Sequence, residues 1–135
     1  MPHVVTCLLM HEDTLLLLKR SNKVRTYKGM WGAVAGYVKE HKDPYETALE
    51  EISEEAGLEK TDVKLVKKIA PVKFTDVYEE KTYEWVVHPF VFTIEKKDKV
   101  QIDWEHTEYV WIPPQHIEHY NTVPHLKEIV QKNLL

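Results

Sequence analysis

The sequence contains a single cysteine, Cys7, in 135 residues. One cysteine excludes an internal disulfide, a CxxC redox pair and a zinc site built from cysteines. We expect Cys7 to be a small core residue on a strand. No apolar stretch approaches the roughly 20 residues that would cross a bilayer, and residues 1–5 lack the basic and long apolar regions of a signal peptide. These absences predict a cytoplasmic protein.

Arginine is scarce, and basic residues do not outnumber acidic ones. Arg20 and Arg25 are the only arginines, so any bidentate guanidinium contact with a phosphate has to involve them. Basic residues number 18 against 22 acidic ones, a net charge of -4, which argues against a general nucleic-acid-binding protein. With no repeat or low-complexity linker in the sequence, we expect a single domain over residues 1–135.

Apolar runs indicate a mixed α/β (α+β) architecture. Residues 3–10 and 14–19 are expected to form two strands joined by a hairpin, and residues 31–38 a buried strand. The remaining expected elements are strands over 63–76, 83–95 and 107–112, a helical turn at 113–114 and an amphipathic helix over 123–134. Strands with helices on their faces predict an α/β/α sandwich.

The clearest helix prediction lies between Asp43 and Gly57. Asp43 is a good N-cap, Pro44 suits the first helical position, and Glu46 completes a capping box. Gly57 is typical of the residue that follows a helix. Apolar residues recur at helical spacing and form one stripe, at Tyr45, Ala48, Leu49, Ile52 and Ala56.

Five glutamates crowd onto the same helix, namely Glu46, Glu50, Glu51, Glu54 and Glu55. At about 100° per residue, Glu51, Glu54 and Glu55 share one flank of the apolar stripe. Like charges at i,i+4 destabilise a helix by about 0.2–0.5 kcal/mol per pair, which a divalent cation would turn into coordination. Carboxylates without nearby Cys or His favour Mg²⁺ or Mn²⁺. A solvated acidic face is the alternative.

A basic loop precedes the expected strand at 31–38. Residues 19–30 contain no acid, and their cations are Lys19, Arg20, Lys23, Arg25 and Lys28. Cations one strand away from a cluster of anions suit a polyphosphate, because the basic groups and a metal ion would share its charge. We therefore expect Arg20, Arg25 and Lys19 to bind substrate, with simple solvation of the loop as the alternative.

Residues 36–58 resemble the signature of the Nudix hydrolase family, G-x5-E-x7-R-E-U-x-E-E-x-G-U, where U is aliphatic. The matching positions are Gly36, Glu51, Ile52, Glu54, Glu55, Gly57 and Leu58. The segments LLLLKRS, GMW and WEHTEYVWIPPQHI stand in the order usual for the family, so the resemblance covers roughly residues 4–120. Two positions depart from the signature: Lys42 replaces its first Glu, and Glu50 replaces its Arg.

The resemblance implies a Nudix-type α/β/α sandwich with a mixed sheet. It also implies hydrolysis of a pyrophosphate bond in a nucleoside diphosphate linked to another moiety, with Mg²⁺ or Mn²⁺ held by Glu51, Glu54 and Glu55. A carbonyl of Ala35 or Gly36 is a further candidate ligand. The implied partner is a small nucleotide-type substrate, with RNA only as a substrate, no membrane, and a homodimer as one option.

The two departures have physical consequences. The Arg of the signature helps to orient the acidic cluster, whereas Glu50 adds a negative charge, and we expect Glu50 to be solvated. Lys42 adds a cation at the helix entrance, where it weakens metal binding or contacts a phosphate. These changes leave open a catalytically weakened or inactive Nudix-like nucleotide-binding module. An isopentenyl diphosphate isomerase relative is disfavoured, because residues 31–38 lack the cysteine which that chemistry requires.

Hydrolysis also requires a general base within hydrogen-bond reach of the attacking water. Glu105 in DWEHTE is the preferred candidate, and Glu54 is the first alternative inside the signature. The other candidates are Glu51, Glu108, Glu79, Glu80 and Glu84. Aromatic residues that could stack on a base, or belong to the core, are Trp104, Tyr27 and Trp31. We expect no metal role for the histidines, including His88, His116 and His119.

Overall fold

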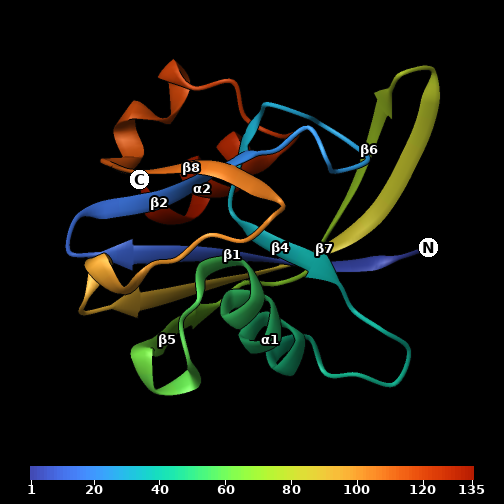
Figure 1. Ribbon diagram of the computed structural model, residues 1–135. Coiled ribbons are helices and arrows are strands. Elements are labelled where there is room, and N and C mark those ends of the chain that lie inside the picture. The colour runs from blue at the N-terminus through green and yellow to red at the C-terminus, as the bar shows by residue number, and fades with distance from the viewer.

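The computed structural model describes residues 1–135, and its centre is one eight-stranded mixed β-sheet between two helical layers (Figure 1). The strands are β1 (His3–His11), β2 (Thr14–Arg20), β3 (Trp31–Gly32), β4 (Val34–Tyr37), β5 (Val63–Lys68), β6 (Val72–Tyr78), β7 (Lys81–Ile94) and β8 (His106–Ile112). The helices are α1 (Pro44–Ala56) and α2 (Leu126–Leu134), with short 3₁₀ helices η1 (Lys60–Asp62), η2 (Lys97–Lys99) and η3 (Pro114–His119). The sandwich expected from the sequence is confirmed.

Each face of the sheet has its own apolar core, because successive residues of a strand point to opposite faces. In β1, Val5, Cys7 and Leu9 belong to the core beneath α1, whereas Leu8 belongs to the core beneath α2 and η3. Strand β2 divides its leucines between the two cores in the same way. The expectation for Cys7 is confirmed, since it lies on β1 with 1% of its surface exposed.

Strand β1 organises the sheet, because it pairs with three other strands. It runs parallel to β7, with Leu8 opposite Val91. Its first half pairs antiparallel with β4, where Cys7 lies opposite Val34, and only its end pairs with β2. Strand β2 therefore diverges from β1 and pairs with β3 and β8 instead. This divergence brings β4 and the basic loop before β3 next to one another.

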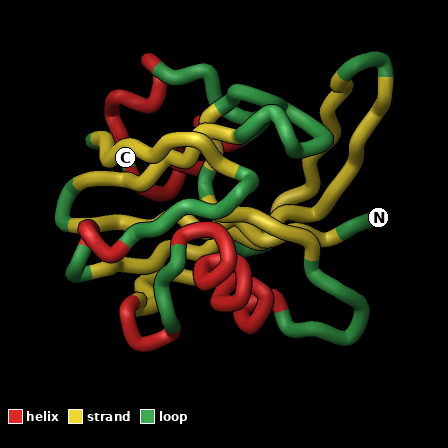
Figure 2. Tube along the Cα trace, viewed as in Figure 1, coloured by secondary structure: helices red, strands yellow, loops and turns green.

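One expected strand was wrong as a single element. Residues 63–76 form β5 and β6, separated at residues 69–71, where Pro71 has no N–H to contribute to a ladder. Both strands pair with the same long neighbour, β5 along the second half of β7 and β6 along its first half. The β6–β7 hairpin projects beyond the rest of the sheet (Figure 2).

Two other boundaries differ from the expectation. Residues 31–38 contain two short strands rather than one, because β3 pairs with β2 while β4 pairs with β1. Helix α2 begins at Leu126 instead of residue 123, since His125 has a left-handed backbone with φ 69° that a helix cannot contain. The hairpin of β1 and β2, and the strands β7 and β8, follow the predicted ranges to within one or two residues.

Candidate functional site

Helix α1 begins and ends where the sequence indicates. The Asp43 carboxylate accepts the backbone N–H of Glu46 at 3.2 Å, Pro44 is the first helical residue, and Gly57 ends the helix with φ 68°. The expected capping box is only half formed, since the Glu46 side chain returns no hydrogen bond to Asp43. The apolar stripe of α1 packs on β1 and β4, which holds one acidic flank of the helix close to β4.

Glu55 is the most deeply buried carboxylate of this flank, with 4% of its side chain exposed. Its Oε1 accepts the backbone N–H of Ala35 at 3.3 Å, whereas its buried Oε2 meets no hydrogen-bond donor. Burial raises the pKa of Glu55 well above its ordinary value, and the neighbouring Glu51 raises it further. An ionised carboxylate in this position is unfavourable unless a proton or a cation compensates it.

Glu51 lies directly against Gly36 of β4. A Cβ atom at position 36 would lie 2.3 Å from Cδ of Glu51, so only glycine leaves room for the carboxyl group in this position. Burial raises the pKa of Glu51, although a hydrogen bond with Glu55 opposes that shift. Two carboxyl groups in such contact share a proton or require a positive charge, because like charges this close resist joint ionisation.

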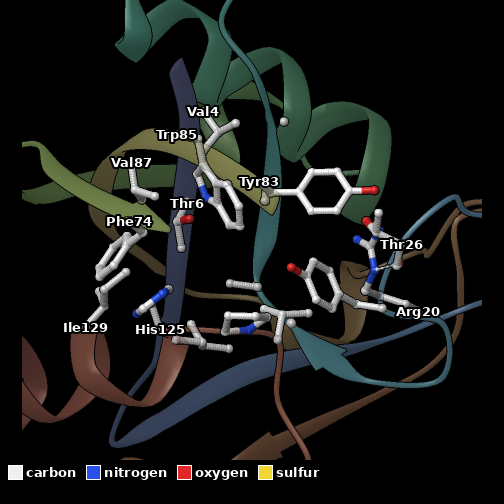
Figure 3. A pocket seen from close by; sticks show the side chains of 18 of the residues that line it. Val4, Thr6, Arg20, Thr26, Phe74, Tyr83, Trp85, Val87, His125 and Ile129 are labelled. Atoms are coloured by element: carbon white, nitrogen blue, oxygen red, sulfur yellow. Dashed lines mark hydrogen bonds between the residues drawn. The ribbon is translucent and has the colours of Figure 1, made fainter. Parts of the chain in front are cut away.

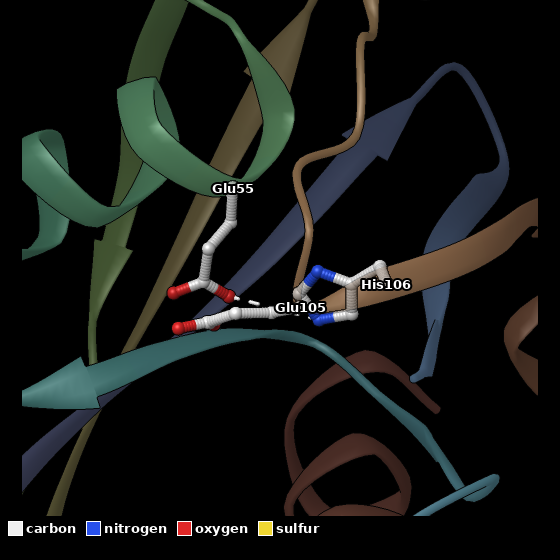
Figure 4. A group of neighbouring side chains, drawn as sticks. All are labelled: Glu55, Glu105 and His106. Atoms are coloured by element: carbon white, nitrogen blue, oxygen red, sulfur yellow. Dashed lines mark ion pairs between the residues drawn. The ribbon is translucent and has the colours of Figure 1, made fainter. Parts of the chain in front are cut away.

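Glu105 and His106 join this group from the loop before β8 and the first residue of β8 (Figure 4). One ligand atom each from Glu55, Glu105 and His106 lies within 4.8 Å of the other two. The distance from His106 Nε2 to Glu55 Oε1 is 3.9 Å, and His106 Nδ1 lies 3.0 Å from Oδ1 of Asp103. Burial raises the pKa of Glu105 and lowers the pKa of His106.

His106, which has only 2% of its side chain exposed, was not expected at this site. No histidine was expected to bind a metal, and His88, His116 and His119 were the ones weighed for that role. In the structure His88 stacks on His3, and His116 stacks on His119, away from the acidic group. The one available signal for His106 was its place beside Glu105 in the sequence DWEHTE.

The acidic flank is only partly gathered. Glu54 is exposed and forms no hydrogen bond or ion pair, although its charge acts on both Glu51 and Glu105. On the other flank Glu50 forms an ion pair with Lys42, which lowers the pKa of Glu50 and raises that of Lys42. Glu50 is exposed, as expected, and in addition pairs with Lys42, which the sequence did not predict. The two positions that depart from the Nudix signature thus contact one another. Position 42 carries a base where the signature has an acid, and position 50 carries an acid where it has a base.

The basic residues expected to bind substrate are separated in the structure. Arg20 is half-buried, donates to the backbone carbonyl of Thr26 at 2.9 Å, and lines a mostly apolar cavity. Glu105 and Glu55 act electrostatically on Arg20, whose pKa is lowered by burial. Lys19 instead approaches Glu108 at 3.5 Å, and Arg25 is exposed without an ion pair.

The cavity beside Arg20 has a volume of about 200 Å³ and lies between β4, β6, β7 and α2 (Figure 3). Arg20 and Thr26 stand at one end, whereas Phe74 and His125 stand at the other. Gly36 also lines the cavity, so its wall adjoins the acidic group through the residue that contacts Glu51. The cavity is thus apolar along most of its length and charged at the end near α1.

Tyr27 ties the basic loop to the β6–β7 hairpin beside this cavity. Its hydroxyl donates to the Asp76 carboxylate at 2.7 Å, and its ring lies 4.5 Å from that of Tyr78. Burial and this hydrogen bond raise the pKa of Tyr27 above its ordinary value. Trp31 packs against Tyr120 in the core beneath α2, so it is not free to stack on a ligand.

The remaining candidates for a general base lie elsewhere. Glu108 faces Lys19 on β8. Glu79 and Glu80 form the tip of the β6–β7 hairpin, and Glu84 is exposed on β7 opposite Thr75. Trp104, which precedes Glu105, is 60% exposed at the surface. Of the late carboxylates considered in the sequence, Glu105 is the one that the fold brings to Glu55.

The residues present fit a divalent cation. Glu51, Glu55 and Glu105 contribute carboxylate oxygens to one region, and Oε2 of Glu55 is buried there without a donor. Burial, and with it the repulsion between neighbouring carboxylates, raises the pKa values of these groups, and a positive charge among them opposes both effects. Oxygen-rich sites of this kind suit Mg²⁺ and Mn²⁺.

Comparisons with known proteins agree with this architecture. A profile of the NUDIX domain matches residues 1–132. Nucleoside triphosphatase NudI of Escherichia coli is 26% identical over 125 residues, which cover 87% of this chain and 86% of NudI. Among solved structures, E. coli dihydroneopterin triphosphate pyrophosphohydrolase superposes with a TM-score of 0.80 at 15% identity, covering 97% of this chain and 93% of that one. A C. elegans Ap4A hydrolase gives 0.78 at 17% identity, covering 98% and 94%.

The chain therefore belongs to the NUDIX family. The Nudix fold and the class of Nudix-type hydrolases acting on phosphoanhydride bonds, both expected from residues 36–58, are confirmed. No helix in the structure is long and apolar enough to span a membrane.

Proposed function

We propose that the protein is a divalent-metal-dependent pyrophosphohydrolase that cleaves a pyrophosphate bond in a nucleoside diphosphate linked to another moiety. The observation that carries this proposal is the buried Glu55 carboxylate. Its Oε2 has no hydrogen-bond donor, and its neighbours Glu51 and Glu105 are acidic as well. A folded protein tolerates such a group where binding of a cation offsets its unfavourable burial.

The proposed metal ligands are Glu51, Glu54 and Glu55. Bound Mg²⁺ or Mn²⁺ would neutralise phosphoryl oxygens and lower the pKa of a coordinated water. Glu51 is held by its contact with Gly36, and Glu55 by the N–H of Ala35, so these two carboxylates are already oriented. The exposed Glu54 side chain is free to turn toward the cation from the same flank of α1.

Glu105 is the proposed general base, with Glu54 as the alternative. Glu105 is partly buried, and burial together with the charges of Asp103 and Glu51 raises its pKa. A carboxylate with a raised pKa accepts a proton from water more readily than an ordinary one. The loop before β8 holds it close to Glu55, where a nucleophilic water would lie.

The cavity and Arg20 are the proposed substrate site. Arg20 stands where the cavity meets the acidic group, so its guanidinium can share phosphate charge with a cation. The apolar remainder, with Phe74, Tyr83 and Trp85, suits a flat ring. The names of the relatives, which include a nucleoside triphosphatase and a dihydroneopterin triphosphate pyrophosphohydrolase, support a substrate that joins a ring to a phosphoanhydride.

The roles of the two arginines can be separated kinetically. Arg20→Ala should raise KM by roughly tenfold while changing kcat less, because an interaction worth about 1.4 kcal/mol in binding is removed. Arg25→Ala should leave KM near the wild-type value, because Arg25 is exposed away from the cavity. Steady-state kinetics on the best substrate decide the matter, and an unchanged KM for Arg20→Ala would remove Arg20 from the substrate site.

A substrate panel tests the proposed function. Phosphate or pyrophosphate release is measured with ADP-ribose, nucleotide sugars, dinucleoside polyphosphates, nucleoside triphosphates and triphosphorylated RNA, each with Mg²⁺ and with Mn²⁺. We expect metal-dependent turnover of at least one substrate and none after EDTA treatment. Turnover that persists without metal, or in the Glu55→Gln variant, would overturn the proposal.

The alternative, a nucleotide-binding module without turnover, is favoured by Lys42 and Glu50. These residues pair with one another, and neither forms a hydrogen bond to Glu51 or Glu55. Binding of a substrate from the panel without its cleavage would support this alternative. A cytoplasmic location, a single domain and a homodimer remain predictions, to be tested by fractionation, limited proteolysis and light scattering.

A further inference from the structure

We propose that Nε2 of His106 is a nitrogen ligand of the divalent cation, beside the carboxylate of Glu55, with Glu105 left as the general base. This inference rests on the proposed function, because it adds a ligand to the same site. It goes beyond that function by predicting which kind of cation the site prefers. Its basis is the position of a buried imidazole between Glu55 of α1 and the adjacent Glu105 of the loop before β8 (Figure 4).

The hydrogen bonds of Asp103 define which His106 nitrogen is free. Oδ1 of Asp103 lies 3.0 Å from His106 Nδ1 and also accepts the backbone N–H of Glu105 at 3.2 Å. Because the Asp103 carboxylate already accepts the N–H of Glu105, it acts as an acceptor toward His106 as well. Nδ1 of His106 therefore carries the hydrogen and donates it to Asp103. The lone pair of the imidazole then lies on Nε2, which points toward Glu55.

This lone pair has no hydrogen-bond partner. The carboxylate oxygen of Glu55 is 3.9 Å from Nε2, which is too far for a hydrogen bond, and the two side chains are 2% and 4% exposed. The oxygen of Glu55 that faces Nε2 is Oε1, which accepts the N–H of Ala35, whereas Oε2 is buried without a donor. Because buried polar atoms are almost always satisfied, a cation at this carboxylate would satisfy Oε2 and offer the lone pair of Nε2 a partner as well.

The spacing of His106 and Glu55 agrees with a single coordination sphere. Nε2 and Oε1 lie 3.9 Å apart, which is within the roughly 4.2–4.6 Å that separates two ligands on opposite sides of a cation with bonds of about 2.1–2.3 Å. Asp103 behind His106 also completes a carboxylate–histidine–metal arrangement, in which the carboxylate fixes the orientation of the ring.

A nitrogen ligand changes the preference of the site. Carboxylates alone suit Mg²⁺, whereas imidazole favours transition metals along the Irving–Williams order. We therefore expect the wild-type protein to bind Mn²⁺ more tightly than Mg²⁺, and the His106→Gln variant to lose about tenfold or more in Mn²⁺ affinity. Its Mg²⁺ affinity should change less, so the ratio of the two affinities falls.

Electron spin-echo spectroscopy of bound Mn²⁺ tests the ligand directly. The wild-type protein should show the coupling of a coordinated ¹⁴N nucleus, and incorporation of ¹⁵N-labelled histidine should convert it into ¹⁵N coupling. His106→Gln should abolish the coupling, whereas the control His116→Gln should retain it, because His116 is exposed on η3. Calorimetry on the same samples gives the Mn²⁺ and Mg²⁺ affinities.

The possible results separate this inference from the proposed function. Mn²⁺ that binds without histidine nitrogen coupling overturns the role of His106 and leaves the carboxylate site intact. Failure of Mn²⁺ and Mg²⁺ to bind at all overturns both. The labelling result on the wild-type protein does not depend on any variant folding, since missing ¹⁵N coupling is already decisive.

Discussion

Helix α1 carries two glutamates, Glu50 and Glu55, that differ completely in their surroundings. Glu50 is half-exposed and pairs with Lys42, and this partner lowers its pKa. Glu55 is buried against β4, has an oxygen without a donor, and has a raised pKa. One helix therefore presents a compensated carboxylate on one flank and an uncompensated one on the other.

The difference in burial and pairing separates a proposed metal ligand, Glu55, from a surface acid, Glu50. Both residues belong to the same Glu-rich helix, and the sequence separates them only by their flank and by the family signature. Lys42 compensates Glu50, and under the proposed function an external cation compensates Glu55. Burial that is unfavourable to folding is typical of a binding site rather than of a stabilising feature.

The largest expected effect is on turnover. Glu55→Gln should lower kcat by 100-fold or more, about 2.7 kcal/mol in the barrier, because the buried carboxylate that faces the cation is lost. Glu50→Gln should change kcat by no more than a few-fold. Both are measured on the best panel substrate with saturating Mg²⁺, and a Glu55→Gln variant with more than one-tenth of wild-type turnover would contradict the comparison.

The second largest difference between Glu50 and Glu55 is expected in the stabilisation that a bound cation provides. At a Mn²⁺ concentration of 100 times Kd, the wild-type protein should gain about 2.7 kcal/mol in its free energy of unfolding. Glu50→Gln should show the same gain, whereas Glu55→Gln should show little. Urea denaturation with and without Mn²⁺ measures this, and equal gains in both variants would place the cation away from Glu55.

The pH dependence of stability should have opposite signs at the two sites. Without metal, Glu55 keeps its proton after the unfolded chain has released it, so stability falls as pH rises above the ordinary Glu pKa of about 4.3. Glu50 has a lowered pKa, so its pairing with Lys42 contributes above that value and is lost on acidification.

Denaturation in EDTA between pH 4 and pH 8 measures how the free energy of unfolding changes with pH at both sites. Glu55→Gln should reduce the fall toward high pH and raise stability at pH 8 by about 1–3 kcal/mol, as expected for removing an unsatisfied buried group. Glu50→Gln should affect only the acidic side of the profile. An unaltered profile in Glu55→Gln would mean that its carboxyl group is compensated in the folded protein.

The smallest effect is expected for the Lys42–Glu50 pair. Lys42→Glu places a like charge beside Glu50 and should lower stability slightly, because exposed ion pairs contribute little. The double variant Lys42→Glu/Glu50→Arg, which restores the order of the family signature, should recover that loss. Thermal denaturation of the two single variants and the double variant measures the coupling, and strictly additive effects would show that the pair does not interact in solution.

Much of the fold was predictable because its signals are local. The hairpin of β1 and β2 follows from alternating apolar runs, and Asp43, Pro44 and Gly57 define α1. The split of residues 63–76 has a local signal in Pro71, whereas the pairing of both segments with β7 could not be predicted from either segment. Strand periodicity describes one segment at a time and carries no information about a shared neighbour.

The acidic residues of the site were predictable from the sequence, whereas their arrangement in space was not. Glu51 and Glu55 follow from helical spacing, and Glu105 from the resemblance. That His106 joins them depends on the chain bending between Glu105 and the start of β8, since adjacent residues within a strand point to opposite faces. Lys42 and Glu50 are not at helical spacing, so their pairing depends on the path of the loop before α1.

The close fit of Glu51 against Gly36 has a consequence for how such a domain can lose its chemistry. A single methyl group at position 36 would meet only the end of a flexible side chain, so the scaffold could accept it while the carboxylate swung away. One added carbon atom at this position is therefore expected to remove hydrolysis without preventing folding. A Gly36→Ala variant would still bind a nucleotide and would no longer hydrolyse it.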